Sequence, residues 1–171
     1  GGVDGEVDTA TATSADAPID ITAAAISIAG TANNNVNAGT AAITITESFG
    51  DGIDLGGAVS GGSALALSGT ELQNVFTAGT FTALSSGVVG ANGLTSANTA
   101  NIGTVTLDST GSTVNLVGSN AFQAVVFADP VELQGGAVTV DTSGANGTAN
   151  FQSTIDGDTA DVSNYSLTVT A

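Results

Sequence analysis

The sequence predicts an all-β fold, and within that class a β-solenoid of about eight rungs. Short runs of alternating β-branched and small residues occur along the whole chain, separated by Gly, Asn, Asp and Ser. The stronger runs recur at irregular steps of roughly 20 residues, which is enough for one coil of a solenoid. Aromatic residues make up only 4% of the chain, so Val, Ile, Leu and Ala must form a core of thin, repeated layers. We expect one domain over residues 1–171, acting as one unit of a longer repeat array or filament.

The expected strands follow the β-branched runs in chain order. Weaker strands are expected at the apolar pairs Ile19/Ile21, Ile53/Leu55 and Val131/Leu133. The stronger strand cores are Val7–Thr13, Ala25–Ile28, Ala42–Thr46, Ala64–Leu67, Thr80–Leu84, Gly103–Leu107, Val114–Val117, Ala124–Phe127, Ala137–Val140, Ala149–Gln152 and Ser166–Thr170.

Helix signals are almost absent. The best candidate is a single capped turn between Ser68 and Phe76, where Ser68 precedes Glu71 by three residues. A pilin-like β-sandwich is the alternative fold, because its short strands recur at about 8–12-residue spacing. The sandwich would show stronger inside–outside alternation and more large core aromatics, so the solenoid is favoured.

The charge composition limits the possible functions. The chain has 16 acidic residues and no Lys, Arg, His, Cys, Met or Trp, which gives a formal net charge of −16. Without bases nothing can clamp phosphate, so nucleic acid is not an expected partner. Without His, Lys or Cys the usual general bases and nucleophiles are missing, so we expect no enzyme. No apolar run reaches the roughly 18 residues that a membrane span needs, so no membrane insertion is expected.

The C-terminal third resembles a known repeat. The order is Asp129-Pro130-Val131, then Val138-Thr-Val140-Asp141-Thr-Ser143, then Thr154-Ile155-Asp156-Gly157 and Leu167-Thr-Val-Thr170-Ala171. Residues 121–171 are similar to repeats of filamentous-haemagglutinin-type bacterial surface proteins, and residues 65–81 are weakly similar to another unit of them. The resemblance implies a right-handed parallel β-helix in an extracellular or cell-surface fibre, and it carries no catalytic residues. Members of that family usually contain some Lys and Arg, which this chain lacks.

The two ends of the chain predict self-association. Joining Ala171 to Gly1 would give a strand, a Gly turn and a second strand. We therefore expect the chain to stack head to tail with itself, or to repeat in tandem. The leading function is a structural extracellular fibre, sheath or adhesin segment. The alternatives are a pilin-like subunit that donates the strand Val7–Thr13, and a Ca²⁺-dependent module that binds surface glycans.

Two clusters of aspartates are candidate Ca²⁺ sites, because Ca²⁺ prefers oxygen ligands. Asp156, Asp158 and Asp161 form the better candidate, and Asp51 with Asp54 forms the weaker one. The competing interpretation is that Asp-Gly pairs simply make turns. No organic cofactor is expected, so Ca²⁺ is the one candidate ion. The sequons at Asn146 and Asn164 are interpreted as turn residues.

Overall fold

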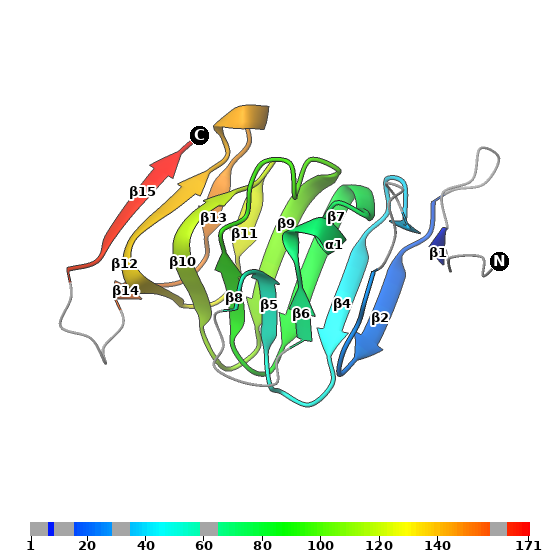
Figure 1. Cartoon of the computed structure of the whole chain (residues 1–171), viewed down its shortest axis with the longest axis horizontal. Coiled ribbons are helices and arrows are strands. Elements are labelled where there is room, and N and C mark those ends of the chain that lie inside the picture. The colour runs from blue at the N-terminus through cyan, green and yellow to red at the C-terminus, as the bar shows by residue number, and fades with distance from the viewer. Residues whose placement is uncertain (1–6, 9–15, 29–34, 59–64, 158–163) are drawn as a thin grey trace.

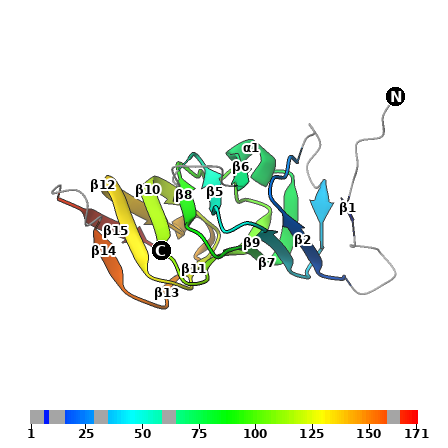
Figure 2. The same cartoon turned by 90° about the horizontal axis from the view of Figure 1, so that it is seen from below.

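The computed structural model describes residues 7–8, 16–28, 35–58, 65–157 and 164–171, and it is all-β with two parallel sheets (Figure 1). The strands β1 and β2 lie at one end of the long axis and β14 and β15 at the other, and the strands cross this axis one after another (Figures 1 and 2). An eight-stranded sheet contains β1 (Val7–Asp8), β2 (Ile19–Ala23), β3 (Val36–Asn37), β4 (Ile43–Glu47), β7 (Val75–Ser85), β9 (Ile102–Ser109), β11 (Val125–Phe127) and β13 (Ala149–Phe151).

The second sheet has seven strands, and two short helices connect strands. The strands are β5 (Ile53–Gly56), β6 (Leu65–Leu67), β8 (Val89–Asn92), β10 (Val114–Ala121), β12 (Val131–Asp141), β14 (Ile155–Gly157) and β15 (Ser166–Thr170). The helices are α1 (Gly69–Leu72) and the 3₁₀ turn η1 (Ser143–Ala145).

Every strand pairing within the described residues is parallel. From β7 to β14 the chain passes alternately between the two sheets, and from β9 on each of these strands pairs with the strand two before it in the chain. This pairing argues against the β-sandwich alternative, whose strands pair antiparallel.

The two sheets have equal depth along their longest paths. One path runs β2-β4-β7-β9-β11-β13, and the other runs β6-β5-β8-β10-β12-β14. The chain reaches this balance by a backward step: β6 follows β5 in sequence but pairs on the side of β5 away from β8. The insertion that contains β6 and α1 therefore supplies the first strand of the second sheet and does not extend this sheet at its other end.

The core consists of columns of small apolar side chains, one from each layer. One column in the first sheet runs Ile19, Ile43, Phe81, Val105, Val125 and Ala149, and the parallel register places each residue beside the next. The matching column in the second sheet runs Leu65, Ile53, Val89, Val114, Val131 and Ile155. Inside the stack these side chains are almost fully buried.

Most expected strands are present, but several details of the prediction are wrong. Residues 25–28 form no strand, and the strand lies earlier at β2. The strands β3 and β8 were not predicted, since Val36–Asn37 is very short and Val89-Gly-Ala-Asn92 carries little β-branched signal. Of the predicted strand Val7–Thr13, residues 9–13 lie outside the described residues. The described strands stack six deep, which is fewer than the expected rungs of about eight.

The predicted capped turn is the helix α1. The Ser68 hydroxyl accepts a hydrogen bond from the Glu71 N–H, and the Glu71 carboxylate accepts one from the Ser68 N–H at 2.9 Å. The same carboxylate accepts a bond from the Ile28 N–H at 3.1 Å. This capping box thus also fixes the segment that follows β2.

Candidate functional site

The C-terminal end of the stack exposes side chains that other layers bury. Ile155 of β14 is 41% exposed, whereas its register partner Val131 is 2% exposed. Val169 of β15 is 46% exposed, whereas its partner Val140 is fully buried. These two residues are two of the three large hydrophobic side chains that are exposed in the described part of the chain. Among the described residues, no further strand covers the inward columns at this end.

The first sheet ends in the same way. Phe151 of β13 is only half-buried, although its register partner Phe127 is fully buried. The two rings stack with centroids 4.6 Å apart and an interplanar angle of 20°. This stack continues the core to the last described strand of the sheet, so the apolar surface spans both sheets. We call the surface formed by β13, β14 and β15 the C-terminal end face.

The end strands also carry backbone groups that point away from the described strands beside them. The Val125 N–H bonds to the Thr148 carbonyl, and the Gln152 N–H bonds to the Phe127 carbonyl, at 2.9 and 3.0 Å. Because a parallel strand alternates the direction of its backbone groups, the N–H and C=O of Ala149 and Phe151 point away from β11. By the same alternation those of Ile155 and Val169 point away from β12. A sheet edge of this kind can pair with another strand.

At the N-terminal end the two sheets differ. Leu65 and Leu67 of β6 are fully buried, and Leu72 of α1 is 1% exposed, so this end of the second sheet is covered. In the first sheet Ile19 is 6% exposed and Ile21 is half-buried, and β2 pairs only with β4. Ile19 is thus buried within the single chain, unlike Ile155 and Val169 at the C-terminal end.

A line of polar groups follows the corner between the two sheets. Glu47, Ser85 and Ser109 occupy successive layers and are each at most 4% exposed. The Glu47 carboxylate accepts bonds from the N–H groups of Phe49, Gly50 and Asp51 at 2.6, 2.6 and 3.0 Å, and one from the Ser85 hydroxyl at 3.3 Å. Ser109 donates its hydroxyl to the Gly87 carbonyl at 2.7 Å, and its N–H bonds to Asp129 at 2.7 Å. These side chains provide hydrogen-bond partners for the backbone N–H and C=O groups of the turns.

The chain backbone at this corner needs glycine. Gly52 has φ +106°, and a Cβ there would lie 2.4 Å from the Val88 carbonyl oxygen. The corner therefore depends on both Glu47 and the adjacent glycine.

The electrostatics of the corner explain two pKa shifts of opposite sign. Burial would raise the pKa of Glu47, but the backbone N–H groups hold that pKa below its ordinary value. At Asp108 burial, followed by the charge of Asp129, raises the pKa. Asp108 and Asp129 interact as a pair of acids, and no described cationic side chain lies beside them. Ionising both carboxyl groups therefore costs free energy.

The predicted Ca²⁺ ligands are only partly placed. Asp156 lies exposed on β14, next to Glu132 in the register, while Asp158 and Asp161 lie outside the described residues. Asp51 is exposed in the corner turn, whereas Asp54 is 5% exposed on β5. The described residues contain no group of three acidic side chains that could hold a metal ion. Ca²⁺ binding stays a prediction.

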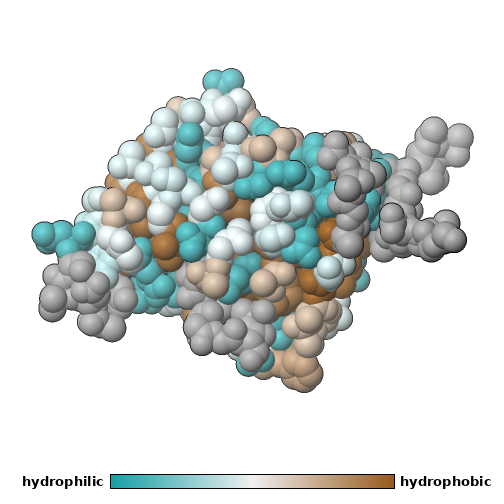
Figure 3. All heavy atoms as spheres, viewed as in Figure 1, coloured by the Kyte–Doolittle hydropathy of each residue, from teal (hydrophilic) through white to brown (hydrophobic). Residues whose placement is uncertain are grey.

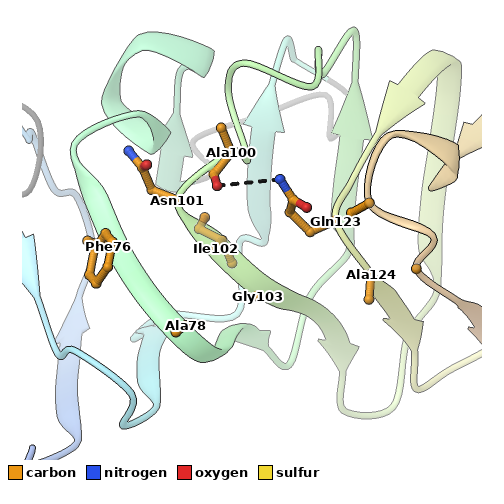
Figure 4. A pocket seen from close by; sticks show the side chains of 10 residues that line it. Phe76, Ala78, Ala100, Asn101, Ile102, Gly103, Gln123 and Ala124 are labelled. Atoms are coloured by element: carbon orange, nitrogen blue, oxygen red, sulfur yellow. Dashed lines mark hydrogen bonds between the residues drawn. The ribbon is translucent and has the colours of Figure 1, made fainter.

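A shallow groove of about 450 Å³ lies where β7, β9 and the segment before β11 meet (Figure 4). Its lining includes Phe76, Ile102, Gly103 and the amide of Gln123, and none of its lining residues is charged. The Gln123 amide donates to the Ala100 carbonyl at 3.4 Å. The Gln123 side chain therefore joins two successive turns of the chain by a hydrogen bond.

One residue of the turn regions agrees with its interpretation from the sequence. Asn146 has φ +51°, the left-handed conformation of a turn residue, as interpreted from the sequence.

On the face drawn in Figure 3, hydrophilic and weakly apolar residues alternate with scattered hydrophobic ones. No helix in the described part is long and apolar enough to span a membrane.

Comparison with known proteins gave no match: no protein-family model, curated protein or solved structure is similar to the chain. The resemblance of the C-terminal third to filamentous-haemagglutinin-type repeats stays a prediction from the sequence.

Proposed function

We propose that the chain is a right-handed parallel β-helix that serves as a structural segment of an extracellular fibre, sheath or adhesin and stacks end to end. The observation that carries this proposal is the pair of parallel sheets of equal depth, between which the chain passes repeatedly. In such a stack each strand pairs with the layers before and after it, so stiffness comes from the backbone and from the apolar columns. The exposed C-terminal end face supplies a surface for further stacking.

The composition supports a passive structural role. Buried polar groups at the corners bond mainly to backbone groups, as Glu47 and Ser109 do. Strand donation by a pilin-like subunit is less well supported, because Val7–Asp8 already pairs with β3 of the same chain.

Diffraction from an oriented film of the purified chain tests the β-helix. Strands stacked along the long axis should give a strong axial reflection near 4.8 Å, whether or not separate chains associate. A film without this axial reflection would contradict the proposed architecture.

Immunogold labelling of the producing cells tests the fibre role. We expect label on surface fibres or on the sheath. Label confined to the cell interior would contradict an extracellular role.

A further inference from the structure

We infer that the groove across β7, β9 and the segment before β11 binds a short neutral oligosaccharide, and that this binding needs no metal ion. The inference deepens the proposed adhesin role and rests on it, because it names the class of ligand that the fibre would hold. The groove is formed within a single chain, and its lining residues come from successive layers of the first sheet (Figure 4).

The groove is elongated because small residues follow one another from layer to layer. Ala78, Gly103, Ala124 and Gly147 line it, and the register of the sheet assigns them to four successive layers. A Cβ at Gly103 would overlap the Ala78 carbonyl oxygen, so no larger residue fits there. Four layers at a spacing of about 4.8 Å extend over about 14 Å. This shape suits a chain of several sugar units better than a single compact molecule.

Two amide side chains in the lining have oxygens that are free to accept hydrogen bonds. The Asn101 amide donates to the Gln73 carbonyl at 3.1 Å, and the Gln123 amide donates to the Ala100 carbonyl at 3.4 Å. These bonds orient both amides, because only the nitrogen of an amide can donate. Neither amide oxygen accepts a hydrogen bond from a described residue. A ligand that is rich in hydroxyl donors matches these acceptors.

One aromatic ring stands beside the amides. Phe76 is half-buried and lines the groove from β7 (Figure 4). The face of an aromatic ring carries partial negative charge, and the C–H groups of a sugar ring carry partial positive charge, so the two pack favourably. An apolar lining with one aromatic ring and a few polar groups is typical of small-molecule sites. Hydroxyl donors and an apolar C–H face occur together in a sugar.

The charge distribution selects a neutral sugar. No residue of the lining is charged, although the chain carries a net charge of −16. The negative potential of the whole chain disfavours acidic glycans. The lining also offers no carboxylate to a cationic ligand or to Ca²⁺. This site therefore differs from the Ca²⁺-dependent glycan module that the sequence raised as an alternative.

Nuclear magnetic resonance of the ¹⁵N-labelled full 171-residue chain tests the site. The neutral probes are cellotriose, maltotriose, mannotriose and triacetylchitotriose, each added at millimolar concentration in the presence of EDTA. We expect at least one of them to shift the side-chain amide signals of Asn101 and Gln123 in a saturable way. Trigalacturonate, an acidic probe of the same length, should not shift them.

Three variants place the ligand in the groove. Ala78 is exposed, so Ala78→Leu should fold normally, fill the groove and abolish the shifts. Phe76→Ala should weaken binding about fivefold, because it removes the ring contact. Ala66→Leu changes an exposed alanine on β6, outside the groove, and should bind as the natural chain does. Circular dichroism of each variant checks that the fold is retained.

The outcomes separate this site from the proposed function. The site would be overturned if none of the neutral trisaccharides shifts the two amides, if the shifts require Ca²⁺, or if folded Ala78→Leu binds with unchanged affinity. In each of these cases the axial 4.8 Å reflection and the surface label would still support the structural role. A missing reflection or label confined to the cell interior would overturn that role, even where trisaccharide binding persists.

Discussion

At the scale of single residues, the structure meets its polar needs without a single basic side chain. Carboxylates take the positions where backbone N–H groups converge, as at Glu47 and Glu71. Burial alone would raise the pKa of Glu71, but bonds from Ser68 and Ile28 hold it below its ordinary value. Because the pKa values of Glu47 and Glu71 are lowered in the folded state, these two residues make the free energy of unfolding increase with pH.

The stability should fall at acid pH because of Glu47. A folded-state pKa below the unfolded value means that the unfolded chain binds more protons, so the stabilisation is present above the ordinary glutamate pKa, about 4.5. It is lost as the pH falls through the lowered pKa. Glu47→Gln should lower the melting temperature at pH 7 and reduce its change between pH 6 and pH 3. Calorimetry measures both, and an unchanged pH profile would contradict the role of Glu47.

Asp108 provides a control of opposite sign. Its pKa is raised, so its contribution to stability decreases as the pH rises through the folded pKa. Asp108→Asn should therefore leave stability near pH 3 almost unchanged and raise the melting temperature at pH 7. A loss of stability at pH 7 would show that Asp108 is not repelled by Asp129.

At the scale of elements, alternate residues of the edge strand β15 direct their backbone N–H and C=O groups toward β12 and away from it. The Thr142 N–H bonds to the Thr170 carbonyl, so Thr168 and Thr170 direct their backbone groups to β12. Leu167 and Val169 direct theirs outward. A substitution at neighbouring residues can therefore affect either the last layer itself or only its contact with a further layer.

Proline should separate these two effects. Thr168→Pro removes a donor of the β12–β15 ladder and should lower the melting temperature by several degrees. Val169→Pro removes an outward donor and should cost much less. Equal losses in a thermal melt would contradict the alternation assigned to β15. Sequence reasoning alone would have placed the sensitive positions at Leu167 and Val169, because it cannot tell which edge of a strand is paired.

At the scale of the whole molecule, the net charge and the aspartate clusters predict an effect of cations. Millimolar Ca²⁺ should raise the melting temperature more than Mg²⁺, because Ca²⁺ accepts irregular oxygen cages. Asp156→Asn should reduce the specific Ca²⁺ shift, and Asp20→Asn, which removes an exposed carboxylate outside both clusters, is the matched control. Equal shifts in Ca²⁺ and in NaCl of the same ionic strength would reduce the effect to screening.

The sequence by itself determined the all-β class, most of the strands and the capped turn. These features follow from local chemistry: β-branched alternation at 43–47, and Ser68 three residues before Glu71. The short strand β3 and the glycine-containing β8 were missed, because they gain their stability from neighbouring layers and not from their own residues.

The parallel pairing agrees with the β-helix expected from the sequence, whereas only the tertiary structure decided the equal depth of the sheets and the exposure of one end. The backward step at β6 has no local signal, since Leu65–Leu67 would pair equally well on either side of β5. The open end face was also not predictable from residue types: Val131 and Ile155 are similar side chains, yet one is buried and the other is 41% exposed. Their difference arises from position in the stack, because an apolar column is buried only where another layer lies above it.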